Sequence, residues 1–233
     1  MSYDSLAARY DRWTREYDGD LPFYVEHARE AGGPIVELGV GTGRVAVPTA
    51  QAGIGVIGID SSEGMLAACR RRAEEAGVTH LLDLRLGDIA DPPVQEKTAL
   101  VTCPYRTMTH LKSDEERRRA LEAIHQILVP GGRFTFDVFA PEPGGERDDE
   151  EWFTPVPGIE ERARWDAERR AIVLEMRGSD FETTLEWAWV TPEEWRTLLE
   201  EAGFEIHACY GWFDLRPAVG PISVFVARRP AAV

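Results

Sequence analysis

Short apolar runs alternate with amphipathic stretches through most of this 233-residue chain. Five of the runs have the length and composition of strands buried in a parallel sheet, at residues 35–38, 54–59, 81–86, 99–103 and 133–139. Stretches with helical periodicity lie between them, at about residues 44–52, 61–76 and 113–128. Strands that alternate with helices predict an α/β fold with a mostly parallel, Rossmann-like sheet.

Two helices are predicted before the first strand, at residues 5–17 and at about residues 21–30. Apolar and aromatic residues follow one face of the first helix: Leu6, Tyr10, Trp13 and Tyr17. This stripe either packs against the sheet or covers a ligand, and helical spacing alone does not separate the two.

The region after the fifth strand has a different composition. Residues 141–158 are rich in Pro, Gly, Asp and Glu, which predicts a loop, and two or three strands are expected within residues 159–190. The last strand alternates Phe181, Leu185, Trp187 and Trp189 on one face. Residues 141–190 are therefore expected to form a small inserted antiparallel β lobe, and residues 1–140 and 191–233 to form the core.

The chain after the lobe begins with a strong helix start. Thr191, Pro192 and Glu194 supply an N-cap, a first-turn proline and a capping box, and Gly203 ends the helix. Strands at residues 204–210 and 222–227 then close the sheet as an antiparallel pair.

The stretch at residues 34–60 carries the strongest ligand signal. Gly39, Gly41 and Gly43 follow a buried strand with the spacing G-x-G-x-G, whereas a dinucleotide fingerprint needs G-x-G-x-x-G. Glu37 precedes these glycines and would repel a pyrophosphate, but it suits a cationic ligand. Asp60 ends the next strand, at the sheet edge where a carboxylate accepts hydrogen bonds from ribose hydroxyls.

Two segments in this stretch, E-L-G-x-G-T-G-R and G-I-D-x-S-x-x-M-L, resemble the S-adenosylmethionine-binding core of the class I methyltransferases. The Gly87–Ile89 and L-x-P-G-G segments also resemble that family. The resemblance implies a seven-stranded sheet in the order 3-2-1-4-5-7-6 with the last strand antiparallel. It also implies S-adenosylmethionine as cofactor and S-adenosylhomocysteine as product.

The resemblance assigns cofactor contacts to residues that match the family's motifs. These are Glu37, Gly39, Gly41, Gly43, Arg44, Asp60, Ser61, Met65, Asp88, Ile89 and Cys103. The fourth strand departs from the family pattern, because Lys97 and Thr98 stand where F-D is common, and Cys103 replaces a frequent Asp or Asn.

The acceptor site is expected beside the loop CPYRTMTHL, which follows the fourth strand. His110 in this loop is the candidate general base, because a base is needed if the acceptor is an alcohol or phenol. The candidate acceptor contacts are Tyr10, Tyr17, Tyr105, Arg106, Trp189, Tyr210 and Trp212. Trp187 and Trp189 have an alternative role as lobe core.

The formal net charge of −15 argues against a nucleic-acid partner, and no run is long and apolar enough for a membrane span. Three widely spaced cysteines argue against disulfides and a metal site, so a cytoplasmic setting is expected. The expected partner is a small-molecule substrate, with the protein a monomer or homodimer.

The residues and the resemblance together predict transfer of a methyl group from S-adenosylmethionine to N or O of a small molecule by in-line displacement. Two alternatives stay open. One is a nucleotide-dependent oxidoreductase, and the other is a non-catalytic S-adenosylmethionine-binding module.

Overall fold

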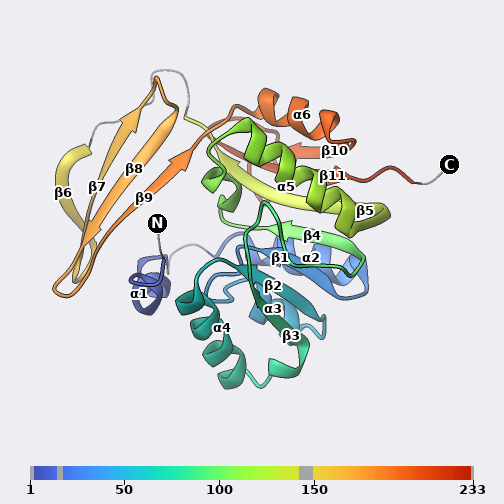
Figure 1. Ribbon diagram of the computed structural model, residues 1–233, viewed down its shortest axis with the longest axis horizontal. Coiled ribbons are helices and arrows are strands. Elements are labelled where there is room, and N and C mark those ends of the chain that lie inside the picture. The colour runs from blue at the N-terminus through green and yellow to red at the C-terminus, as the bar shows by residue number, and fades with distance from the viewer. Residues whose placement is uncertain (1–2, 15–17, 142–148, 232–233) are drawn as a thin grey trace.

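The computed structural model describes residues 3–14, 18–141 and 149–231. A large sheet with helices on both faces forms the core, and a smaller sheet projects from one side of it (Figure 1). No helix in the described part of the chain is long and apolar enough to cross a membrane.

The core sheet has seven strands in the order β10-β11-β5-β4-β1-β2-β3. Strands from β3 to β5 run parallel, and β11 is antiparallel to both β5 and β10. Read from the β3 edge, with β10 and β11 counted as the sixth and seventh core strands, this is the predicted order 3-2-1-4-5-7-6, which is confirmed. The strands are β1 (Ile35–Leu38), β2 (Val56–Asp60), β3 (Leu82–Leu86), β4 (Thr98–Cys103), β5 (Leu128–Phe139), β10 (Glu205–Tyr210) and β11 (Ile222–Arg228).

Helices cover both faces of this sheet because strands buried on both sides expose apolar residues to each face. One face packs against α5 (Asp114–Ile127) and α6 (Pro192–Glu201). The helices of the other face are α2 (Leu21–Ala31), α3 (Ala46–Gln51) and α4 (Glu63–Glu75). The remaining helices are α1 (Ala7–Trp13) and the 3₁₀ turns η1 (Thr79–Leu81) and η2 (Thr107–His110).

Polar caps fix the starts of three helices where the sequence predicts them. The Ser62 hydroxyl accepts a hydrogen bond from the Met65 amide at the start of α4. Ser113 opens α5 and Thr191 opens α6, each with a complete capping box.

The structure corrects three boundaries. The first helix is shorter than expected, with α1 covering only Ala7–Trp13. The L-x-P-G-G segment lies inside β5 as an irregularity: the register with β4 shifts between Leu128 and Arg133, and Gly131 takes a positive φ of 81°. Part of the predicted loop forms the strand β6 (Asp149–Val156), whose charged residues and proline are tolerated at a sheet edge.

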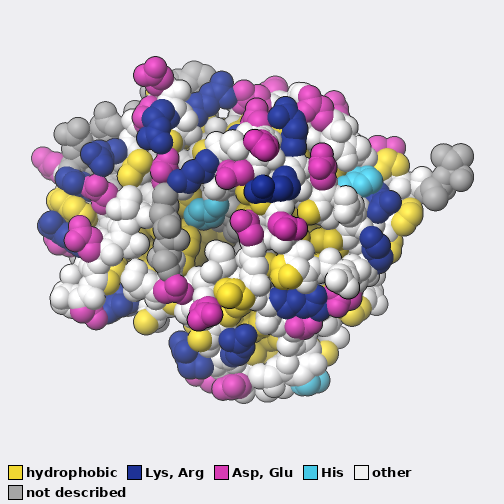
Figure 2. Space-filling model, in the orientation of Figure 1, with side chains coloured by type: hydrophobic (Ala, Val, Ile, Leu, Met, Phe, Trp, Pro, Cys, Tyr) yellow, Lys and Arg dark blue, Asp and Glu magenta, His cyan; other side chains and the backbone are white. Residues whose placement is uncertain are grey.

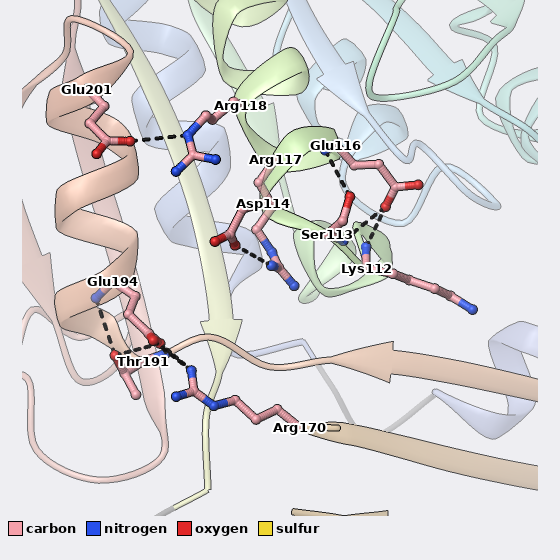
Figure 3. A network of polar contacts seen from close by, with 10 residues as sticks. All are labelled: Lys112, Ser113, Asp114, Glu116, Arg117, Arg118, Arg170, Thr191, Glu194 and Glu201. Carbon is pink, nitrogen blue, oxygen red and sulfur yellow. Dashed lines mark hydrogen bonds and ion pairs between the residues drawn. The ribbon is translucent and has the colours of Figure 1, made fainter. Parts of the chain in front are cut away.

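The smaller sheet has four antiparallel strands in the order β6-β7-β8-β9, with β7 (Ile159–Asp166), β8 (Ala171–Arg177) and β9 (Glu182–Ala188). Polar contacts join it to the core. Arg170, just before β8, donates to Glu194 on α6 at 2.6 and 2.8 Å, and Lys112 before α5 pairs with Glu186 on β9 at 3.0 Å. Figure 3 shows Arg170 reaching from the lobe to the first turn of α6, beside the first turn of α5.

Candidate active site

A cavity of about 580 Å³ lies between the carboxyl ends of the core strands, the N-terminal helix and the lobe. Figure 2 shows a hollow on this face, with hydrophobic side chains inside and charged side chains along its border. We call its two sides the strand-end wall and the aromatic wall. The strand-end wall consists of Gly39, Gly41, Asp60, Ser61, Met65, Asp88, Ile89 and Ala90. The aromatic wall consists of Tyr3, Tyr10, Trp13, Tyr105, Arg106, His110, Phe139, Trp165, Leu185, Trp187 and Trp189.

Asp60 organises the strand-end wall. Its carboxylate accepts hydrogen bonds from the Gly41 amide at 2.8 Å and from the Ser62 amide at 2.9 Å. Burial raises the pKa of Asp60, while these backbone bonds favour the charged form. Each oxygen keeps a second lone pair, so the carboxylate can also accept from hydroxyl groups of a ligand.

The glycine turn brings backbone close to the cavity. Gly41 has a φ of 55° and a Cβ there would meet no side chain within 4 Å, so the space beside it is open. Gly39 has a φ of 68°, and a Cβ there would lie 2.4 Å from Cγ2 of Thr107 in η2. The Gly39 contact therefore joins the strand-end wall to the loop that carries His110.

Four residues assigned to cofactor contact lie outside the cavity lining: Glu37, Gly43, Arg44 and Cys103. Arg44 makes two bonds to the buried Asp20, at 2.5 and 2.7 Å, and its guanidinium lies over the Tyr105 ring. Cys103 is fully buried in the core, and a Cβ on Gly43 would lie 2.6 Å from the Cys69 sulfur.

Glu37 lies beneath the glycine turn and is 1% exposed. Burial raises its pKa to about 8, so the carboxyl group is mostly neutral at pH 7. Its Oε2 has no hydrogen-bond partner among the residues that the structure describes. Glu37 does not line the cavity, and its contact with the cofactor stays a prediction.

The N-terminal segment, residues 3–14, closes one side of the cavity, with α1 placed between the lobe and α4 in Figure 1. Asp4 accepts from the Gly64 amide at 2.8 Å, and Asp11 pairs with Arg72 at 3.1 Å. On the other side, the Trp13 indole donates to Glu161 of the lobe at 2.7 Å. The segment therefore contacts both the core and the lobe.

His110 lies on the aromatic wall, as the loop position predicts. Its Nε2 lies 3.1 Å from the Tyr3 hydroxyl, and its ring makes edge contacts with Tyr3 and Trp187. Burial lowers the pKa of His110 to about 4, with a smaller contribution from Lys112, so the ring is neutral at neutral pH.

The acceptor candidates divide by position. Tyr10, Tyr105, Arg106 and Trp189 line the cavity. Tyr210 and Trp212 do not, and they pack in the apolar cluster that contains α2 residues. Tyr17 lies outside the described residues.

The structure adds cavity residues that the motifs did not identify, including Tyr3, Trp13, Thr107, Phe139 and Trp165. Trp13 belongs to the predicted helical stripe and Trp165 to the predicted lobe, so both had a signal in the sequence. Phe139 ends β5, and only the sheet order places it beside the fourth strand's loop.

The strand-end wall fits S-adenosylmethionine in its chemistry. Asp60 offers hydrogen-bond acceptors at the sheet edge, Gly41 leaves room for close approach, and Met65 and Ile89 are apolar. Within the described residues, no group of three or more His, Cys, Asp or Glu side chains is arranged to hold a metal ion.

Residues 35–132 match the family model described as a methyltransferase domain. The putative methyltransferase GWCH70_2453 of Geobacillus sp. (strain WCH70) is 30% identical over 144 residues, which cover 59% of this chain and 58% of that protein. This chain thus spans little more than half the length of the first curated relatives that it matches.

Solved structures show the same fold over nearly the whole chain. The CcbJ methyltransferase from Streptomyces caelestis has a TM-score of 0.79 at 23% identity, over 92% of this chain and 96% of that one. The S-adenosylmethionine-bound amino pentose methyltransferase CalS10 from Micromonospora echinaspora has a TM-score of 0.66 at 22% identity, over 98% and 92%.

The sheet order and the strand-end wall define the fold class as that of the class I methyltransferases. Residues 35–132 match the methyltransferase domain model, and a solved methyltransferase with this fold, CalS10, binds S-adenosylmethionine.

Proposed function

We propose that the protein transfers a methyl group from S-adenosylmethionine to a small molecule bound against the aromatic wall. The observation that carries this proposal is the single cavity, which joins Gly41 and Asp60 to His110 and the lobe tryptophans. When bound, S-adenosylmethionine supplies a methyl group on a positively charged sulfur, and transfer requires in-line alignment of a nucleophile.

We assign cofactor binding and acceptor binding to different residues. Asp60, Gly41, Asp88 and Ile89 would hold the cofactor at the strand ends. The aromatic wall would exclude water and orient a flat or apolar acceptor. The net charge of −15 favours a small molecule over nucleic acid as the partner.

His110 is the candidate catalytic residue. A neutral imidazole can accept a hydrogen bond from the acceptor's N–H or O–H. However, complete proton transfer from a phenol of pKa about 10 to a base of pKa about 4 costs about 8 kcal/mol. The pKa of His110 therefore favours a neutral amine nitrogen over oxygen as the nucleophile, because an amine attacks through its lone pair without prior deprotonation.

Two experiments test the proposal. Calorimetry measures binding of S-adenosylmethionine and of NAD. A panel of amines, phenols and alcohols is then assayed for formation of S-adenosylhomocysteine. We expect S-adenosylmethionine binding and turnover with at least one amine. In His110→Gln we expect kcat to fall about tenfold, as for the loss of one hydrogen bond, with unchanged cofactor affinity, whereas His80→Gln, at an exposed site, should behave as wild type.

Each other outcome favours an alternative. Binding of NAD in place of S-adenosylmethionine would indicate an oxidoreductase. Binding of S-adenosylmethionine without turnover of any acceptor would indicate a non-catalytic module. Full activity in His110→Gln would remove the catalytic role of His110.

A further inference from the structure

Asp137 on β5 carries a buried carboxylate that does not line the cavity. It is 0% accessible to solvent and accepts three hydrogen bonds. The amide of Tyr105 donates to Oδ1 at 2.7 Å, the amide of Arg106 donates to Oδ2 at 3.0 Å, and the Tyr24 hydroxyl of α2 donates to Oδ1 at 2.7 Å.

The two amides belong to an unusual turn. Tyr105 and Arg106 both have a φ of 59°, a left-handed backbone conformation that residues other than glycine rarely adopt. Two consecutive amides in such a turn form a concave site for an anion, and here the carboxylate of Asp137 fills it. The turn therefore depends on this carboxylate for its hydrogen bonds.

The same turn presents two side chains to the cavity. Tyr105 and Arg106 both lie on the aromatic wall, and η2 with His110 follows directly. Thr107, the first residue of η2, fits against Gly39 of the glycine turn. The hydrogen bonds from the Tyr105 and Arg106 amides to Asp137 thus fix the position of this part of the aromatic wall.

We infer that Asp137 is a positioning residue for the methyl acceptor, because its carboxylate holds the Tyr105–Arg106 turn in the conformation that aims both side chains into the cavity. This inference rests on the proposed function, since it assumes that the aromatic wall binds the acceptor. Asp137 itself does not line the cavity, so it acts only through the turn.

The inference has a pH signature. Burial raises the pKa of Asp137 to about 6, against the opposing effects of the Tyr24 bond and the Arg106 charge. The other ionisable groups that face Asp137 are Asp20, Arg44, Cys103 and the Tyr105 phenol. A protonated carboxyl has a donor in place of one acceptor, so the turn should loosen as the pH falls through about 6. The titration of His110, near pH 4, is separate.

Hydrogen exchange in Asp137→Asn tests whether Asp137 holds the turn, and it needs no methyl acceptor. Asparagine keeps the shape, but its amino group must face a backbone N–H. We expect the amides of Tyr105 and Arg106 to exchange at least about tenfold faster than in wild type. Tyr24→Phe is the matched control: it removes one donor to the same carboxylate and leaves both amide bonds, so exchange should change little.

Kinetics with an amine that turns over in the panel described above test the functional step. In Asp137→Asn the acceptor KM should rise about tenfold while S-adenosylmethionine affinity by calorimetry stays within about twofold. In wild type the acceptor KM, expressed as the concentration of neutral amine, should rise between pH 7 and pH 5. If Asp137→Asn does not fold, this pH profile and the pH dependence of exchange decide the question.

Three results would overturn the inference: unchanged exchange in the turn, faster exchange with an unchanged acceptor KM, or a wild-type acceptor KM that is flat from pH 7 to pH 5. If wild type turns over no acceptor, the proposed function has failed. Slow exchange in wild type and fast exchange in Asp137→Asn would then show only that Asp137 holds the turn.

Discussion

The strand-end wall is made of turns that leave the carboxyl ends of core strands, whereas the aromatic wall is made of large side chains from separate segments. The strand-end wall contributes backbone and small groups fixed by the parallel sheet, such as Gly41 and Asp60. The aromatic wall is assembled from the N-terminal segment, the loop after β4, the end of β5 and the lobe. One wall is therefore set by the sheet, and the other by contacts between segments.

This difference indicates which wall can vary in its specificity for the methyl acceptor. The strand-end wall is tied to strand pairing at Asp60, which pairs with Leu86 of β3. The aromatic wall is connected through individual polar contacts, such as Trp13 with Glu161 and Lys112 with Glu186, and by the turn over Asp137. If the proposed function holds, we expect substitutions in the aromatic wall to change the acceptor while cofactor binding is preserved.

Gly39→Ala should give the largest effect because Gly39 is where the two walls touch. An added Cβ would lie 2.4 Å from Thr107 at a φ of 68°, so both the glycine turn and η2 must shift. We expect cofactor affinity and turnover to fall together by about 100-fold. Gly53→Ala, with a φ of 85° and no atom within 4 Å, is the control for backbone strain alone. A loss confined to one of the two measurements would show that the walls are not coupled here.

Asp60→Ala should affect only the strand-end wall. The variant loses the acceptors for the Gly41 and Ser62 amides and for ligand hydroxyls, so calorimetry should show S-adenosylmethionine affinity lowered about 10- to 100-fold. The acceptor KM at saturating cofactor should stay near wild type. Asp91→Ala, at an exposed aspartate near the same edge, should leave the affinity unchanged. Wild-type affinity in Asp60→Ala would contradict the assigned role.

Trp187→Ala should affect only the aromatic wall, and to a smaller extent. It removes a cavity-lining indole beside His110, so we expect the acceptor KM to rise about tenfold with unchanged cofactor affinity. Trp152→Ala is the matched lobe control, because Trp152 lies under Arg162 and Arg177 and does not line the cavity. Equal effects of the two variants would indicate that Trp187 serves the lobe and not the acceptor.

The sequence predicted the core fold and much of the strand-end wall because both are encoded locally. A strand, a glycine turn and a cap follow one another closely in the sequence, so Gly41 and Asp60 were predicted from spacing and Ser61 from the family resemblance. Spacing did not show that the side chain of Arg44 turns inward to the buried Asp20, nor that Glu37 lies beneath the turn.

The aromatic wall was predicted only in part because its members meet through tertiary contacts. Tyr210 and Trp212 are aromatic residues near the end of a core strand, but they pack against α2. Asp137 reads as one polar residue in a buried strand, and nothing in the sequence places it under a turn 31 and 32 residues earlier. The strand β6 was missed because its charges and proline resemble those of a loop.

The clustering of indoles at the aromatic wall has a spectroscopic consequence. The chain has seven tryptophans, and Trp13, Trp165, Trp187 and Trp189 line one cavity. Trp195 is 1% exposed in the core and should emit as a constant background. An acceptor that fills the cavity changes the solvent around four emitters at once, so unlabelled protein reports its own occupancy by fluorescence.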